Sequence, residues 1–255
     1  REPNRGFEPL PNLDFKLVAA DTLITVPEGD RVAFGLFENT TDSFFNELDD
    51  LTTEYFSSYE PKKKKKIKGK IMNLISSKCQ EKIREIERLN ASDKPVHHKV
   101  KNEIEEKARE IRLWQSYENM FKQEAVAFFE PRYFFPKTKE GFDIIIGNPP
   151  YVQIQKFSGQ LVQKDWESQK YETFSKTGDV YCLFYERAYH LLKNKGFLCL
   201  ITSNKWMRAN YGESLRKYFA EKMNPLVLLD FGGYKIFESA TVDTNILIAQ
   251  KAKNQ

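Results

Sequence analysis

A run of three isoleucines, Ile144–Ile146, constrains the fold of this chain more than any other local feature. β-Branched runs of this kind are typical of strands that are buried on both faces of a parallel sheet. The run ends at Gly147, and the next four residues are Asn148, Pro149, Pro150 and Tyr151. Two adjacent prolines can neither continue a strand nor open a regular helical turn. The sequence therefore predicts a buried strand that stops abruptly and presents a rigid tetrapeptide at its carboxyl end.

Segments typical of strands and of helices alternate on both sides of residues 58–130. The predicted strands are Phe15–Asp21, Phe142–Gly147, Phe197–Ser203, Leu226–Phe231 and Thr244–Lys251. The predicted helices are Ser43–Phe56, Gly212–Met223 and Asp179–Gly196, the last closed by its glycine. This alternation indicates an α/β fold with a mostly parallel sheet. Such sheets bind ligands beyond the carboxyl ends of their strands, where Asp21, Asn148 and the Ser203–Asn204 pair fall.

Positive charge is concentrated in one region of the chain. Residues 62–112 contain 17 Lys plus Arg and 8 Asp plus Glu, a net charge of +9; the whole chain has +4, so the rest carries 4 − 9 = −5. The region begins with five consecutive lysines, Lys62, Lys63, Lys64, Lys65 and Lys66. These side chains either contact DNA phosphates or form a solvated helix end, and both interpretations stay open at this point.

The same region has two apolar stripes with helical spacing. The first stripe is Ile67, Ile71, Ile75, Cys79, Ile83, Ile86 and Leu89. The second is Val96, Val100, Ile104, Ala108, Ile111, Trp114, Phe121, Ala125 and Phe128. Because the turn-favouring segment Asn90–Pro95 separates them, we predict an antiparallel helical hairpin. The predicted domains are residues 1–57, the first part of a core; residues 58–130, the basic hairpin insertion; and residues 131–255, the second part of the core.

Composition narrows the class of protein. With 255 residues, of which 40% are hydrophobic, the chain is long enough to bury a sizeable core. The 3 cysteines lack metal-binding spacing and the adjacent His97 and His98 have no accompanying ligand cluster, so we predict no metal site. A sparse, odd cysteine count suits a reducing cytoplasm, and no apolar run approaches the length of a membrane span. Because the chain begins with Arg1, we expect it to be part of a longer polypeptide.

The tetrapeptide contains the groups that methylation of an exocyclic amine requires. The lone pair of a nucleobase amine is delocalised into the ring, so the amine is a poor nucleophile. If the side-chain oxygen of Asn148 and the backbone oxygen of Pro149 accept its two N–H groups, the lone pair becomes localised on nitrogen. Pro150 keeps Pro149 out of the helical region and so directs its carbonyl. The ring of Tyr151 provides a surface for a base that has left its stack.

The Asn-Pro-Pro-Tyr sequence after an apolar strand resembles motif IV of the N6-adenine DNA methyltransferases. Residues 15–24, FKLVAADTLI, are similar to motif III, which implies that Asp21, together with Asn148, contributes to binding S-adenosylmethionine. Residues 177–219 resemble motifs V and VI, and residues 228–251 resemble motifs VII and VIII. The last motif implies that Phe237 packs against the flipped adenine.

Among these enzymes the chain most resembles the large bacterial type IIG restriction–modification proteins. The resemblance implies a partial class I, Rossmann-like methyltransferase fold that carries a long helical hairpin as an insertion. It further implies methylation of double-stranded DNA in the bacterial cytoplasm. The expected neighbours in the parent chain are a segment with motif I and a nuclease before it, and a target-recognition domain after it.

Two motifs of the family are absent from these residues. Neither the glycine-rich motif I nor motif II is present. Asp230–Tyr234 contains two glycines after a strand but lacks the G-x-G spacing, so this segment is interpreted either as a strand-end turn or as a displaced cofactor loop. In the family's strand order, 3-2-1-4-5-7-6, strands 1 and 2 would then be missing and Phe142–Gly147 would be an exposed edge. We therefore expect an incomplete cofactor site and no activity of residues 1–255 alone. The alternatives are an RNA base methyltransferase, a protein glutamine methyltransferase, and a non-catalytic fragment that only binds DNA.

Overall fold

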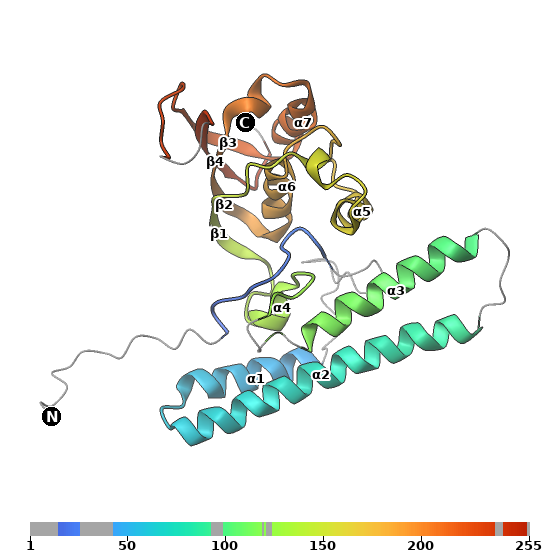
Figure 1. Ribbon diagram of the computed structural model, residues 1–255. Coiled ribbons are helices and arrows are strands. Elements are labelled where there is room, and N and C mark those ends of the chain that lie inside the picture. The colour runs from blue at the N-terminus through green and yellow to red at the C-terminus, as the bar shows by residue number, and fades with distance from the viewer. Residues whose placement is uncertain are drawn as a thin grey trace, which may run out of the picture. The chain divides into compact units, whose positions relative to one another are not determined.

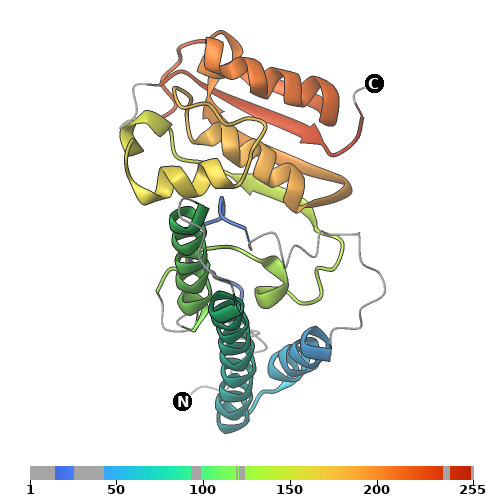
Figure 2. The same cartoon turned by 90° about the vertical axis from the view of Figure 1, so that its right-hand side faces the viewer.

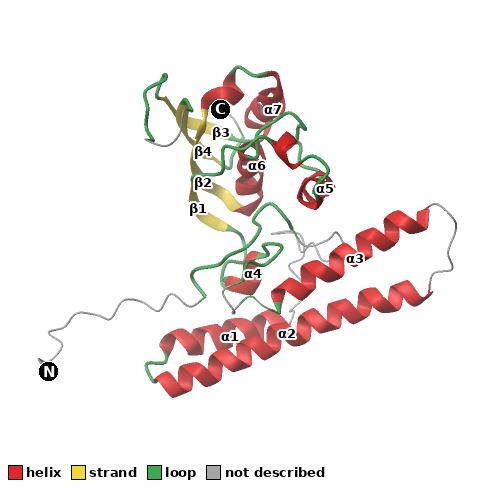
Figure 3. Ribbon diagram, in the orientation of Figure 1, coloured by secondary structure: helices red, strands yellow, loops and turns green. Residues whose placement is uncertain are grey.

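The computed structural model describes residues 15–25, 43–92, 99–118, 120, 124–237 and 242–253. The chain divides into two compact units. The first contains Arg1–Asp21 and Asn39–Lys137, and the second contains Thr22–Glu38 and Thr138–Gln255. In the described residues the first unit is helical and the second contains a sheet with its helices (Figure 3). The fold is therefore α/β, as predicted.

The described part of the first unit consists of helices. They are α1 (Ser43–Ser57), α2 (Pro61–Ser92), α3 (Lys99–Tyr117) and the short α4 (Pro131–Phe134). α2 packs against both α1 and α3, and α2 and α3 run antiparallel, as the two apolar stripes predicted (Figure 1). The buried members of the first stripe are Ile67, Ile71, Ile75, Cys79 and Ile86. The connection between α2 and α3, which includes Val96, His97 and His98, lies outside the described residues.

The second helix of the hairpin is shorter than the apolar stripe predicted. α3 ends at Tyr117, whereas the stripe continues to Phe128. The rings of Tyr117 and Phe128 stack with centroids 4.1 Å apart, and the Tyr117 hydroxyl donates a hydrogen bond to the Phe128 carbonyl at 3.2 Å. Both contacts require the chain to turn back on α3, so the helix cannot run on to Phe128.

The predicted strand at Phe15–Asp21 is wrong. Phe15 lies in a turn with a positive φ of 63°, and Ala20 forms only an isolated bridge with Val126. The ring of Phe15 packs edge-on against that of Tyr55 in α1, with centroids 4.8 Å apart. This aromatic contact with a helix replaces the ladder of backbone hydrogen bonds that a strand would need.

The sheet of the second unit has four described strands. They are β1 (Phe142–Gly147), β2 (Leu192–Ser203), β3 (Asn224–Asp230) and β4 (Thr244–Gln250), in the spatial order β1-β2-β4-β3. β1 and β2 pair in parallel, while β4 is antiparallel to β2 and to β3, so the described sheet is mixed rather than mostly parallel as predicted, although β1, β2 and β3 share one direction. The spatial order β1-β2-β4-β3 is the order expected for strands 4, 5, 7 and 6 of the methyltransferase sheet. The carboxyl ends of β1, β2 and β3 therefore lie at the same edge.

β1 is an edge strand of the described sheet, as expected if strands 1 and 2 are missing. Its isoleucines are not buried on both faces, which corrects the interpretation of the Ile144–Ile146 run. Ile144 is 60% exposed and Ile146 is 76% exposed. Both residues point to the face opposite Ile145, which packs against the buried core.

One face of the sheet is covered by α6 (Tyr181–Leu191) and α7 (Glu213–Lys222), as Figure 2 shows. Leu198 and Leu200 of β2 are buried in the core on this face, whereas the intervening Cys199 is only partly buried. α5 (Leu161–Ser168) and 3₁₀ turns at Ile154–Phe157, Asn204–Met207 and Asn210–Gly212 complete the unit.

Helix α6 is shorter than predicted at both ends, and Gly196 does not close it. The helix stops at Leu191, and Gly196 is part of β2. A Cβ atom at Gly196 would lie 2.9 Å from the carbonyl oxygen of Phe142 in β1. The glycine is therefore needed for the close approach of two strands rather than for a helix end.

Candidate active site

The tetrapeptide follows directly after β1, as predicted. Asn148 is exposed, and no described residue is hydrogen-bonded to its side chain. Pro149 is buried, whereas Pro150 is exposed. A buried proline ring fixes the backbone at the point where the Asn148 amide leaves the sheet. The arrangement holds the backbone firmly and leaves a polar amide open to solvent.

Tyr151 is held against the end of β2. Its hydroxyl donates a hydrogen bond to the carbonyl of Ile201 at 3.2 Å. Its ring meets the fully buried ring of Tyr181 edge-on, with centroids 6.4 Å apart. Partial burial raises the pKa of the Tyr151 hydroxyl, so the phenol remains a neutral donor. The ring orientation is thus fixed from two sides.

The residues after Tyr151 pair with the segment that leads into α6. The Val180 N–H donates to the carbonyl of Val152 at 2.9 Å, and the Ile154 N–H donates to the carbonyl of Gly178 at 2.8 Å. Gln153 and Asp179 form the β-bridge between these two bonds. The tetrapeptide is therefore anchored by β1 on one side and by this short antiparallel pairing on the other.

A second polar cluster lies where β2 and β3 end. The Asn204 side-chain amide donates to Asp230 Oδ1 at 2.9 Å, and the Gly232 N–H donates to the same oxygen at 3.1 Å. The hydrogen bond from Asn204, and to a smaller extent that from Gly232, holds the pKa of Asp230 below its usual value. Gly232 and Gly233 have positive φ values of 58° and 85°, so Asp230–Tyr234 contains a strand-end turn. Asn204 is almost completely buried. In the sequence, only its position at the end of a predicted strand indicated that it belongs to the candidate site.

Phe237 lies in the connection from β3 to β4 and is half-buried. Among the described residues its ring has no contact with that of Tyr151, whose ring neighbour is Tyr181. The structure therefore places Phe237 beyond the strand-end turn without pairing it directly with the tetrapeptide.

Asp21 belongs to the first unit and is half-buried. Its backbone N–H donates to the carbonyl of Val126 at 2.9 Å. The chain enters the second unit at the next residue, Thr22, whose carbonyl accepts a hydrogen bond from Arg187 Nε at 2.7 Å. The backbone is thus fixed on both sides of the Asp21 carboxylate.

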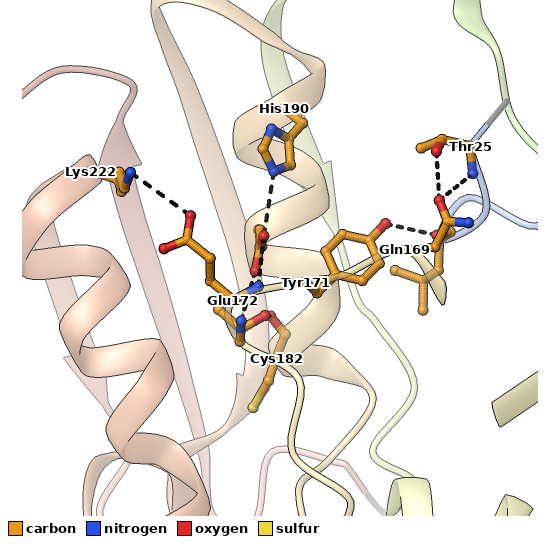
Figure 4. A network of polar contacts seen from close by, with 10 residues as sticks. Thr25, Gln169, Tyr171, Glu172, Cys182, His190 and Lys222 are labelled. Carbon is orange, nitrogen blue, oxygen red and sulfur yellow. Dashed lines mark hydrogen bonds and ion pairs between the residues drawn. The ribbon is translucent and has the colours of Figure 1, made fainter. Parts of the chain in front are cut away.

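Figure 4 shows how the segment after Asp21 is fastened within the second unit. The Tyr171 hydroxyl donates to the Leu23 carbonyl at 2.7 Å, and the Thr25 N–H donates to Gln169 Oε1 at 3.0 Å. Both partners come from the loop between α5 and α6. Side chains of this loop therefore bind the backbone of Leu23 and Thr25.

The same loop is organised by the buried carboxylate of Glu186. Glu186 accepts hydrogen bonds from the N–H groups of Glu172 at 3.1 Å and Thr173 at 2.8 Å. His190 Nε2 lies 3.5 Å from the carboxylate. Burial opposes ionisation of Glu186, but the hydrogen bonds from His190 and the two N–H groups outweigh it and lower its pKa. The Glu186 carboxylate therefore accepts from loop N–H groups that would otherwise need carbonyl partners in a helix or sheet.

A model of the Eco57I restriction-modification methylase family matches residues 55–237, which is more than half of the chain. The chain belongs to this family. The matched range contains the whole Asn148–Tyr151 tetrapeptide and ends at Phe237, whereas Asp21 lies outside it.

Several relatives match part of this Eco57I-family chain. The type II restriction enzyme and methyltransferase RM.Eco57I of Escherichia coli is 33% identical over 132 residues, which are 51% of this chain and 13% of that protein. The type II methyltransferase M.PaeR7I of Pseudomonas aeruginosa is 32% identical over 101 residues, 40% of this chain and 17% of that protein. Each match therefore spans only a small part of the relative.

Among solved structures, the M protein of the type I restriction enzyme EcoKI aligns with a TM-score of 0.34 and 15% identity. The alignment covers 57% of this chain and 29% of that one.

The lysine run of this family member begins α2. Lys63 Nζ lies 3.1 Å from a carboxylate oxygen of Glu54, and Lys64 Nζ lies 5.3 Å from the ring centroid of Tyr55. Lys62, Lys65 and Lys66 are exposed. Two of the five lysines therefore contact α1, and the other three extend into solvent.

Within the part of the chain that the structure describes, no group of three or more His, Cys, Asp or Glu side chains could hold a metal ion. Within the same residues, no helix has both the length and the apolar character to cross a membrane.

Proposed function

We propose that the full-length protein methylates the N6 amine of an adenine that is turned out of double-stranded DNA. The methyl donor is S-adenosylmethionine, and the reaction is the modification step of a bacterial restriction–modification system in the cytoplasm. One observation carries the proposal: a chain of the Eco57I methylase family presents Asn-Pro-Pro-Tyr at the end of β1, with an exposed amide and an oriented aromatic ring.

Three groups of the tetrapeptide act on the target base. The side-chain oxygen of Asn148 and the backbone carbonyl of Pro149 each accept an N–H of the amine. These two hydrogen bonds draw the nitrogen toward tetrahedral geometry and localise its lone pair. The ring of Tyr151 supports the extrahelical base by stacking, and Phe237 contacts the base from the β3–β4 connection. Preorganised acceptors of this kind stabilise the charge that develops on nitrogen during transfer.

The residues present fit part of a cofactor site. When bound, S-adenosylmethionine supplies an electrophilic methyl group. Asp21 suits an adenine amine because a carboxylate accepts N–H hydrogen bonds, and the backbone on both sides of Asp21 is fixed. Asn148 lies at the strand end where the donor and the target base must meet. The glycine-rich loop expected for the rest of the cofactor is not among these 255 residues.

The proposal extends to the arrangement of the longer protein. A segment with motif I and a nuclease precede these residues, and a target-recognition domain follows them. Residues 58–130 form an insertion between two parts of the methyltransferase core, residues 1–57 and 131–255. The exposed lysines among Lys62–Lys66 contact DNA phosphates. RM.Eco57I is named as both a restriction enzyme and a methyltransferase, which is consistent with such a fusion.

The test is to incubate the full-length protein with S-adenosylmethionine carrying a labelled methyl group and, in parallel, with duplex DNA, RNA and a glutamine-containing peptide. Mass spectrometry of hydrolysed DNA should show N6-methyladenine as the labelled product. Label in RNA or in the peptide alone would support one of the alternative acceptors and refute the proposal. Label at cytosine would refute the adenine assignment.

A further inference from the structure

Three side chains behind the tetrapeptide form a continuous chain of hydrogen bonds. The Tyr211 hydroxyl donates to Asp179 Oδ2 at 2.6 Å, and the hydroxyl oxygens of Tyr211 and Tyr181 are 2.9 Å apart. Asp179 is 7% exposed and Tyr181 is fully buried. Tyr181 begins α6, Asp179 lies just before that helix, and Tyr211 comes from the connection between β2 and α7. The chain of bonds therefore links two separate parts of the fold.

The direction of each bond follows from the number of protons available. A phenol has one O–H proton, and that of Tyr211 is used on the carboxylate. Tyr181 must therefore be the donor in its bond to the Tyr211 oxygen. Burial is the main cause that raises the pKa of both phenols, and the bond to Asp179 adds to it for Tyr211. Both hydroxyls are thus protonated throughout the physiological range, and the order carboxylate, Tyr211, Tyr181 is fixed.

The two end residues of this series of hydrogen bonds, Tyr181 and Asp179, contact the tetrapeptide or the residues that follow it. At one end, the Tyr181 ring meets the Tyr151 ring edge-on. At the other end, the backbone of Asp179 is bridged to Gln153, two residues after Tyr151. A rotation of Tyr181 would remove the support beneath the Tyr151 ring, and a shift of Asp179 would move the backbone that follows it.

We propose that Tyr211 and Asp179 are positioning residues that hold the Tyr151 ring in the orientation on which the target base stacks. This inference rests on the proposed function and adds two residues to it. Asp179 is buried, so it does not touch the base itself and acts through Tyr211 and Tyr181. The distances between consecutive hydroxyl and carboxylate oxygens leave no room for a water in between.

The test compares Tyr211→Phe with Tyr218→Phe in the full-length protein. Tyr218 is a suitable control because it is buried in the same core but takes no part in this chain of bonds. Tyr211→Phe should lower the single-turnover rate of methyl transfer roughly tenfold and reduce the fluorescence rise of 2-aminopurine at the target position, because it removes the hydroxyl that joins Asp179 to Tyr181 and with it both hydrogen bonds. Tyr218→Phe should leave both within about twofold. Cofactor affinity should be unchanged in both variants.

A second pair of variants separates positioning from simple loss of stability. Asp179→Asn retains an oxygen that accepts from Tyr211 and should keep most of the rate, whereas Asp179→Ala removes this acceptor and should lower the rate in the same direction as Tyr211→Phe. Equal losses in Tyr211→Phe and Tyr218→Phe, or a full rate in Tyr211→Phe, would overturn the proposal.

Failure of the proposed function has a different signature. If the wild-type protein methylates RNA or a glutamine peptide instead of DNA, only the proposal that DNA is the acceptor fails. Tyr211→Phe and Tyr218→Phe are then compared on the acceptor that is methylated. A readout independent of catalysis is ¹⁹F NMR of protein labelled with fluorotyrosine, in which the Tyr151 signal is assigned with Tyr151→Phe. Tyr211→Phe should broaden or shift that signal, and Tyr218→Phe should not; an unchanged signal in both would contradict the positioning role.

Discussion

Replacements of Tyr151 separate its hydroxyl, which is bonded to Ile201, from its ring, which the proposed function assigns to the target base. Tyr151→Phe removes only the hydroxyl that donates to the Ile201 carbonyl at 3.2 Å. Since a net hydrogen bond contributes about 0.5–1.5 kcal/mol and this one is long and only partly buried, the free energy of unfolding should fall by about 0.5 kcal/mol. The ring and its edge-on contact with Tyr181 remain, so capture of the base should fall less than in Tyr151→Ala.

Tyr151→Ala removes the ring itself. Base–aromatic stacking contributes about 1–3 kcal/mol, so the equilibrium that places the base in the site should fall by roughly 5–150-fold. The assay is the fluorescence of 2-aminopurine at the target position of a duplex bound by full-length protein. Tyr59→Ala is the control, because Tyr59 is an exposed tyrosine in the other unit. A 2-aminopurine signal in Tyr151→Ala equal to that of wild type would refute the stacking role.

Three further predictions concern other regions. Replacing Lys62–Lys66 with Gln should reduce the salt dependence of DNA binding by about 0.9 in the log–log slope for each phosphate that the lysines no longer neutralise, and an unchanged slope would favour a solvated helix end. Gly212→Ala should lower the free energy of unfolding by about 1–3 kcal/mol or more, because its Cβ would overlap the Trp206 carbonyl oxygen. Gly69→Ala, in an open part of α2, should instead stabilise by about 0.5–1 kcal/mol, and thermal unfolding would show opposite shifts. Burial opposes ionisation of Glu186, but hydrogen bonding lowers the pKa of its carboxyl group from the usual 4.5. The stabilisation by Glu186 is therefore complete above pH 4.5 and is lost as the pH falls through the lower pKa of the folded state. Urea unfolding between about pH 7 and pH 3 should therefore show a steeper acid loss for wild type than for Glu186→Gln; parallel curves would contradict this account.

Much of the sheet and its end could be predicted because the signals are local. The isoleucine run and the paired prolines define β1 and its end within a few residues, and helix α7 follows from its own apolar spacing. The strand order depended on the family resemblance, since no local pattern in the chain specifies which strands are neighbours. Asn148–Tyr151 were predicted as site residues from the same local signal, because their residue types are rare in this combination.

The elements that were wrongly predicted depend on contacts between distant residues. Phe15 is drawn into a turn by the ring of Tyr55, and α3 stops where Tyr117 stacks on Phe128. Gly196 resembled a helix end but accommodates a neighbouring strand.

The same limit applies to the candidate site. The hydrogen bond between Tyr211 and Asp179 joins residues 32 positions apart, and neither belongs to a recognisable spacing. Such contacts become visible only when the fold brings the two segments together, whereas the tetrapeptide is visible as four adjacent residues.

The most direct test of the proposed chemistry is the rate of N6-methyladenine formation in duplex DNA by full-length protein that carries Asn148→Ala. Removal of one preorganised polar group should reduce the single-turnover rate by about 10²–10³-fold, while affinities for DNA and cofactor change little. Asn194→Ala, at an exposed asparagine in β2, is the matched control and should retain the wild-type rate. An Asn148→Ala protein that forms N6-methyladenine at the rate of this control would show that the tetrapeptide does not activate the amine.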